Sequence, residues 1–143
     1  MGPIFLDTNI LLYSISTARA ERDKRQRSLE LLDRDDIGLS VQVLQEFYVQ
    51  ATRPTRADRL PHDIAAGLIT AWTRFRVQPN NLQILASALQ IKGAHGFSYW
   101  DSAIIAAAQA LGCGELYTED MQHGRQLGGV TIINPFREPH SLT

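Results

Sequence analysis

The stretch Ile4-Phe5-Leu6-Asp7-Thr8-Asn9 leads a short apolar run directly into three polar residues. Apolar runs of this length are typical of buried strands. In open α/β sheets, ligands bind beyond the carboxyl ends of such strands, which is where Asp7 stands. The position has two interpretations at this stage, because Asp is also a favoured cap for a helix that starts at Thr8. The role of Asp7 therefore depends on partners elsewhere in the chain.

Outward from this stretch, predicted strands alternate with predicted helices along the chain. The strands are Ile4–Leu6, Ile37–Leu39, Arg76–Val77, Glu115–Tyr117 and Val130–Ile133. The patterns of apolar and charged residues predict helices at Glu21–Leu32, Val41–Ala51, His62–Arg74, Leu82–Lys92 and Ser98–Leu111. Residues 52–60 are expected to form a loop or the entry to the helix at His62–Arg74, and the tail after Pro135 is expected to be irregular. This alternation predicts an α/β fold with a mostly parallel sheet covered on both faces.

The composition is typical of one soluble globular domain. The chain has 143 residues, of which 44% are hydrophobic and 20% charged, so we expect a single domain over residues 1–143. No apolar run approaches the roughly 20 residues that span a bilayer, and the N-terminus shows no signal-peptide pattern. The single cysteine, Cys113, excludes an internal disulfide. These features fit a cytoplasmic protein without membrane contact.

The net charge and the type of basic residue give different indications about a nucleic-acid partner. The net charge is only −1, so strong overall attraction to nucleic acid is not expected. Twelve of the 14 basic residues are Arg, which suits bidentate phosphate contacts, although a GC-rich genome produces the same bias. Basic runs occur at residues 19–27 and among Arg53, Arg56 and Arg59. Each run suits a nucleic-acid backbone, a solvated face or a surface for a protein partner.

Four carboxylates stand out as candidate functional groups: Asp7, Glu46, Asp101 and Asp120. Asp7 and Asp120 each follow a predicted strand, and Asp101 lies at the head of the apolar face of the Ala-rich helix. Each acid also has a purely structural explanation. Ser98 and Asp101 match a capping box, Glu46 fits an exposed helix position, and Asp120 fits a turn beside the equally placed Glu119.

The distribution of cations favours a functional role for these acids. Neither Lys nor Arg occurs in residues 1–18, 35–52 or 93–124, and these segments contain all four acids. Carboxylates gathered without cations repel one another, and some are protonated unless a cation joins them. Oxygen ligands without thiolates or paired histidines favour a hard divalent ion, Mg²⁺ or Mn²⁺. Arginines brought in from elsewhere in the fold would remove this argument.

Four sequence blocks, in a fixed order, carry a further signal. They are Ile4-Phe5-Leu6-Asp7-Thr8-Asn9, LSVQVLQEFY at residues 39–48, SYWDSAIIAAA at 98–108 and LYTEDMQHG at 116–124, followed by a closing strand and Asn-Pro-Phe at 130–136. In this order and over nearly the whole chain, the blocks resemble PIN-domain nucleases. The resemblance is closest to the VapC-type toxins of type II toxin–antitoxin pairs.

The resemblance implies a three-layer α/β/α sandwich with a mostly parallel central sheet. It implies that Asp7, Glu46, Asp101 and Asp120 gather at the carboxyl edge of the sheet as catalytic residues and as ligands of one or two Mg²⁺ or Mn²⁺ ions. Glu119 is an alternative to Asp120 as the last acid. Small polar positions that would orient these acids or the attacking water match Thr8, Asn9, Ser40 and Thr118.

The implied activity is metal-dependent hydrolysis of RNA by an endoribonuclease toxin that inhibits translation. The implied partners are RNA, a cognate antitoxin protein and a second copy in a homodimer. Bound Mg²⁺ acidifies water and polarises a phosphoryl oxygen, so the acids would hold the metal rather than attack covalently. His123, near Asp120, fits a surface or supporting position better than substrate contact.

Two alternatives remain open from the sequence: a DNA-directed nuclease of the same fold, and a non-catalytic protein-binding module. A haloacid dehalogenase-type phosphatase is disfavoured because its chemistry needs a second Asp where Asn9 stands. A receiver domain is disfavoured because Lys92 lacks a convincing context for the late Lys that such a domain requires.

Overall fold

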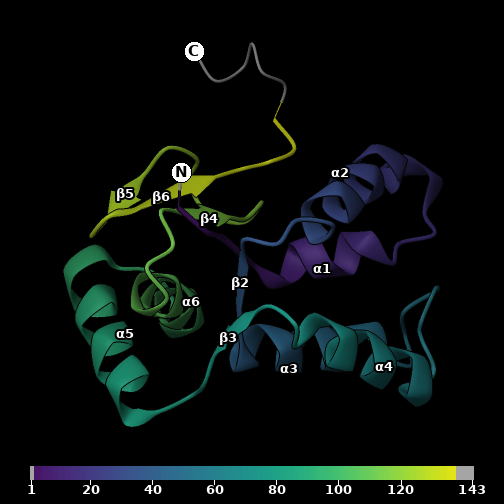
Figure 1. Ribbon diagram of the computed structural model, residues 1–143, viewed down its shortest axis with the longest axis horizontal. Coiled ribbons are helices and arrows are strands. Elements are labelled where there is room, and N and C mark those ends of the chain that lie inside the picture. Colours follow the sequence, from purple (N-terminus) through teal and green to yellow (C-terminus); the bar gives the residue numbers. More distant parts are fainter. Residues whose placement is uncertain (1, 138–143) are drawn as a thin grey trace.

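The computed structural model describes residues 2–137 and has a six-stranded sheet at its centre (Figure 1). The strands are β1 (Ile4–Leu6), β2 (Ile37–Ser40), β3 (Arg76–Gln78), β4 (Glu115–Tyr117), β5 (Gln126–Leu127) and β6 (Val130–Ile133). Their order in the sheet is β3-β2-β1-β4-β6-β5. Every pairing is parallel except the β5–β6 hairpin, so the predicted mostly parallel sheet is confirmed.

Helices cover both faces of the sheet and complete a three-layer sandwich. They are α1 (Thr8–Ser14), the 3₁₀ turn η1 (Arg19–Glu21), α2 (Arg22–Leu32), α3 (Val41–Ala51), α4 (His62–Trp72), α5 (Leu82–His95) and α6 (Tyr99–Ala110). Helices α5 and α6 pack together on one side, and α1 to α4 lie on the other (Figure 1). Within residues 2–137, none of these helices has the length and apolar character needed to cross a membrane.

The core explains why the short strands are stable. Phe5, Leu39 and Leu116 lie in three adjacent strands and are fully buried. Helix α6 presents small and branched residues to the sheet, among them the buried Ile105 and Ala108. Strands β1 and β2 are buried along their whole length and read as nearly continuous apolar runs, which is why the sequence revealed them.

The order of the strands determines where a site can form. From β1 the chain moves through β2 to β3 on one side, and it later returns to place β4 on the other side of β1. Such a reversal leaves a crevice at the carboxyl ends of the two strands, where ligands bind in open α/β sheets. Leu6 is in register with Tyr117, so Asp7 and Thr118 leave the sheet side by side.

The structure differs from the sequence prediction in its turns and helix ends. Strand β5 was not predicted; it pairs with β6 through Gly128 and Gly129, which have φ values of +52° and +87°. Positive φ at both central residues is what a two-residue hairpin requires. Helix α5 runs three residues beyond its predicted end and stops at Gly96, whose φ is +75°. Helix α4 ends two residues early, at Trp72.

The predicted loop at residues 52–60 is confirmed, since this segment contains neither helix nor strand. Pro135, Phe136 and Arg137 form a turn and a bend. The rest of the tail that we expected to be irregular, residues 138–143, lies outside the described residues, as does Met1.

Candidate active site

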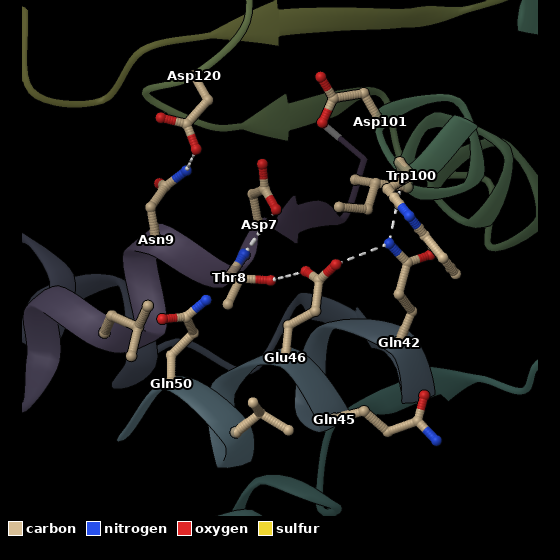
Figure 2. Close-up of a pocket in the computed structure, with 13 residues that line it drawn as sticks. Asp7, Thr8, Asn9, Gln42, Gln45, Glu46, Gln50, Trp100, Asp101 and Asp120 are labelled. Atoms are coloured by element: carbon tan, nitrogen blue, oxygen red, sulfur yellow. Dashed lines mark hydrogen bonds between the residues drawn. The ribbon is translucent and has the colours of Figure 1, made fainter. Parts of the chain in front are cut away.

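The four candidate acids line one pocket of about 580 Å³ at the carboxyl edge of the sheet. Asp7 follows β1, Glu46 lies in α3, Asp101 lies in the first turn of α6, and Asp120 follows β4. Their side chains approach a common space from four separate elements (Figure 2). The remaining lining residues are polar or apolar without charge: Thr8, Asn9, Leu12, Gln42, Gln45, Val49, Gln50, Trp100 and Ile104.

Asp7 combines the two roles that the sequence left open. It is the N-cap of α1, and its Oδ1 accepts a hydrogen bond of 2.7 Å from the backbone N–H of Thr8. Its Oδ2 accepts a second bond of 2.7 Å from the Thr118 hydroxyl. Burial raises the pKa of Asp7 to about 7; the bonds from Thr118 and Thr8 lower that pKa, and the charges of Asp120 and Glu46 raise it. Asp7 is thus a buried carboxylate beside other acids.

Glu46 is not an ordinary exposed helix acid. Its Oε1 accepts a 2.5 Å hydrogen bond from the Thr8 hydroxyl, and its Oε2 accepts one of 3.1 Å from the Gln42 side-chain amide. Gln42 lies one helical turn before Glu46 and therefore on the same face of α3. Its amide also donates to the Trp100 carbonyl oxygen at 3.2 Å. Gln42 thus links Glu46 to the first turn of α6, and sequence reasoning missed it.

Asp101 lies at the start of α6, whose N-cap is Ser98. The Ser98 Oγ accepts a 3.1 Å bond from the Asp101 backbone N–H, so this part of the predicted capping arrangement is confirmed. The Asp101 carboxyl nonetheless lines the pocket. Burial raises its pKa, the charges of Asp120 and Glu46 raise it further, and a Ser98 hydrogen bond lowers it.

Asn9 and Thr118 hold Asp120. The Asn9 amide donates to Asp120 Oδ2 at 2.9 Å and to the Thr118 hydroxyl at 3.2 Å. The backbone N–H of Asp120 donates to the same hydroxyl at 3.1 Å. Thr118 is fully buried, so its hydroxyl serves both Asp7 and Asp120 without competition from bulk water.

Glu119 points away from the pocket. Its carboxylate accepts a hydrogen bond from the Tyr13 hydroxyl and forms an ion pair with Lys24. Lys24 also lies over the rings of Tyr13 and Phe136. Burial opposes ionisation of Glu119, but the bonds from Lys24 and Tyr13 outweigh it and hold its pKa below the usual range. Of the two acids that the sequence left as alternatives, Asp120 lines the pocket.

Two further residues considered from the sequence, Ser40 and His123, do not line the pocket. Ser40 does not contact an acid in the described part of the chain; it caps α3 by accepting a 3.2 Å bond from the Val43 N–H. It therefore supports Glu46 through the helix. His123 accepts a 2.9 Å bond from the Asn134 backbone N–H through Nδ1, which ties the loop between β4 and β5 to the residue after β6.

The chemistry of the donor set fits a hard divalent cation. Among the described residues that line the pocket there is neither Lys nor Arg, and the ion pairs within residues 2–137 join other groups: Lys24–Glu119, Arg27–Glu30, Arg34–Asp36 and Arg56–Asp58. Carboxylate oxygens without thiolates are the ligands that Mg²⁺ and Mn²⁺ prefer. Within residues 2–137, however, no three acidic, His or Cys side chains already form a group that could hold a metal.

Comparisons with known proteins agree with this architecture. Solved structures of similar fold include a toxin–antitoxin complex from Klebsiella pneumoniae, with TM-score 0.68, 18% identity and coverage of 94% of this chain and 99% of that one. VapC20 of Mycobacterium tuberculosis, described as a sarcin–ricin loop cleaving toxin, has TM-score 0.65, 20% identity and coverage of 82% and 89%. DNA-bound VapBC from Salmonella typhimurium has TM-score 0.61, 18% identity and coverage of 92% and 97%.

At these identities the structural likeness shows the shared fold. Comparison with curated proteins gives no match. A family model described as the PIN domain matches residues 4–125, which is most of the chain. The chain therefore belongs to the PIN domain family of nucleases.

Proposed function

We propose that this protein is a metal-dependent endoribonuclease that hydrolyses RNA phosphodiester bonds. The observation that carries the proposal is the convergence of Asp7, Glu46, Asp101 and Asp120 on one pocket without a described basic residue. Four carboxylates in such surroundings repel one another, and a bound cation relieves that repulsion. Mg²⁺ is the proposed ion, with Mn²⁺ as a substitute, and the four acids are its proposed ligands.

When bound, the metal ion would supply an activated water nucleophile and neutralise charge on the phosphate. The residues of the chain prepare that site. The Thr118 hydroxyl and the Thr8 backbone N–H donate hydrogen bonds to Asp7. These bonds favour the ionised form of Asp7 despite its burial. Thr8 and Gln42 fix both oxygens of Glu46. Ligand side chains that are held by such bonds lose little freedom when the cation binds.

The test is cleavage of structured RNAs by the purified protein with Mg²⁺ or Mn²⁺. We expect endonucleolytic products that disappear with EDTA and return when metal is restored. The Asp7→Asn variant is expected to lose roughly 10²-fold or more of the activity, because it removes one proposed ligand charge while preserving the side-chain shape. Activity that survives both EDTA and Asp7→Asn contradicts the proposed mechanism.

The same assay separates RNA from DNA as substrate. Single-stranded and duplex DNAs of matching sequence are incubated beside the RNAs, because metal-assisted hydrolysis can act on the phosphates of either polymer. Preferential cleavage of RNA supports the proposal, whereas equal or faster cleavage of DNA assigns the protein to DNA. Cleavage of neither polymer under any metal condition supports the protein-binding alternative.

We further propose that the protein is the toxin of a type II toxin–antitoxin pair, acting in the cytoplasm as a homodimer and inhibiting translation. The support is the fold shared with structures described as a toxin–antitoxin complex and as DNA-bound VapBC. The partner would be encoded by an adjacent short reading frame. Expression of this chain alone is expected to arrest growth and protein synthesis, and co-expression of the neighbour is expected to restore both. Light scattering measures the mass of the purified protein against that of a dimer.

A further inference from the structure

Trp100 places a large aromatic ring at the edge of the acidic pocket. It directly precedes Asp101 in α6, it lines the pocket, and 62% of it is exposed. The other tryptophan, Trp72, is only 6% exposed and packs against Phe47 in the core. Packing in the core does not explain why an indole this exposed lies beside four acids.

One ring contact and one backbone hydrogen bond help to position Trp100. Its ring and the Tyr99 ring pack edge to face, with a centroid distance of 5.1 Å and an interplanar angle of 79°. Tyr99 in turn packs on the small apolar cluster between α5 and α6. The Gln42 side-chain amide donates one hydrogen bond to the Trp100 carbonyl oxygen and another to Glu46 (Figure 2). The exposed ring is therefore held in register with the acids.

A second pocket of about 490 Å³ continues from the first and shares Gln42, Gln45 and Trp100 with it. None of the described residues that line this second pocket is charged. Apart from the Tyr99 hydroxyl, its polar side chains are amides: the Asn80 side chain donates to Gln45 Oε1 at 3.2 Å, and Asn81 lies beside them. An aromatic face with neutral donors and acceptors suits a nucleobase better than a phosphate.

We propose that this second pocket binds one nucleobase of the RNA substrate, stacked on Trp100 with its edge toward Gln45 and Asn80. The inference rests on the proposed ribonuclease function. The base would be an unstacked one from a single-stranded segment, next to the phosphate in the acidic pocket. Aromatic stacking accepts every base, and the amides supply whatever preference exists among bases.

The test compares Trp100→Leu with Trp100→Phe in an Asp7→Asn background and in EDTA, so that cleavage is suppressed during the binding measurement. Both variants keep an apolar side chain, but only Phe keeps an aromatic face. The probes are short oligo-adenylate, oligo-uridylate and oligo-cytidylate, with an abasic ribose-phosphate chain of equal length. Fluorescence anisotropy of end-labelled probes measures affinity in the parent and in both variants. Because Trp72 is buried, quenching of tryptophan fluorescence by a probe in the parent reports on Trp100.

We expect Trp100→Leu to bind the base-containing probes roughly ten-fold more weakly, the order expected for loss of one stacked base, and Trp100→Phe to bind nearly as the parent does. The abasic chain should bind the parent weakly, cause no quenching and lose no further affinity in Trp100→Leu. The inference is overturned if Trp100→Leu keeps full affinity or if the abasic chain binds as tightly as the others. A fall in molar mass by light scattering in Trp100→Leu would overturn it too, because the ring would then lie between two copies.

The two proposals fail in different ways. A wild-type protein that cleaves RNA, with Trp100→Leu unchanged in binding and in the KM for cleavage, overturns the base pocket alone. A wild-type protein that cleaves no RNA overturns the proposed function on which the pocket depends.

Discussion

The Thr118 hydroxyl donates a 2.7 Å hydrogen bond to Asp7 Oδ2 and joins the residues that follow two adjacent parallel strands. The same hydroxyl oxygen accepts bonds from the Asn9 amide and the Asp120 backbone N–H. One buried side chain thus sets the relative positions of Asp7 and Asp120. It also favours the ionised form of a carboxyl whose burial works against ionisation.

Replacing Thr118 by Val should move the pH profile of cleavage to higher pH. The Thr118 bond lowers the Asp7 pKa, so its loss raises that pKa and leaves fewer molecules with an ionised Asp7 at neutral pH. We expect roughly ten-fold less activity at pH 7 and partial recovery at alkaline pH. Thr118→Ser, which keeps the hydroxyl, should restore the wild-type profile. An unchanged profile in Thr118→Val would show that the bond does not control Asp7.

The contribution of Asp7 to the stability of the metal-free protein should fall as pH rises from about 4 to about 7. The folded-state pKa of Asp7 is about 7, whereas an unfolded Asp titrates near 3.9. Burying Asp7 therefore carries no ionisation cost below about pH 4, costs progressively more up to about pH 7, and has a constant cost above that pH. In EDTA at pH 8, Asp7→Asn should therefore unfold with a free energy higher than wild type by on the order of a few kcal/mol. Urea denaturation at pH 5 and pH 8 measures the difference. A lower free energy of unfolding for Asp7→Asn than for the wild type at pH 8 would contradict the conclusion that burial of the ionised Asp7 is unfavourable.

The neighbouring acids Glu119 and Asp120 should behave oppositely. Asp120→Asn removes a carboxylate that lines the pocket, and we expect roughly 10²-fold lower kcat/KM. Glu119→Gln removes a charge that pairs with Lys24 outside the pocket, and it should leave kcat/KM within about three-fold and stability within about 1 kcal/mol. Parallel kinetics of the two variants provide the check. Equal losses would mean that Glu119 takes part in the site.

Gln42 is proposed as a positioning residue, because its side-chain amide donates hydrogen bonds to Glu46 and to the Trp100 carbonyl oxygen. Gln42→Leu removes both bonds at similar size, and we expect kcat to fall roughly ten-fold with KM nearly unchanged. Gln26→Leu, on the exposed surface of α2, is the matched control. A rise in KM without a fall in kcat would instead make Gln42 a binding residue.

The fold was predictable from sequence where apolar runs and helix caps are explicit. Strand β1 is a buried apolar run, and α6 begins at Ser98, a standard cap. Strand β5 was missed because two residues carry no periodicity, although Gly128 and Gly129 provided a turn signal. Helix α5 was predicted to end at Lys92, but it continues to His95 and is closed by Gly96, where the backbone adopts positive φ.

The sequence predicted the four acids that line the pocket better than it predicted the residues that hydrogen-bond to them. The four carboxylates could be identified because the positions of charged residues, and the segments without cations, can be read directly from the sequence. The choice between Glu119 and Asp120 could not be made from the sequence, because it depends on Lys24, which lies 95 positions away from Glu119. Gln42 was accessible only through its one-turn spacing from Glu46, and the exposure of Trp100 follows from packing that no local pattern encodes.

Equilibrium binding of Mn²⁺ at pH 8, measured on the wild type and on single variants, tests the central claim most directly. We expect each of four variants to weaken Mn²⁺ binding roughly ten-fold or more: Asp7→Asn, Glu46→Gln, Asp101→Asn and Asp120→Asn. Glu119→Gln should bind Mn²⁺ as the wild type does. Wild-type affinity in all four pocket variants, or an equal loss in Glu119→Gln, would contradict a metal site built from these acids.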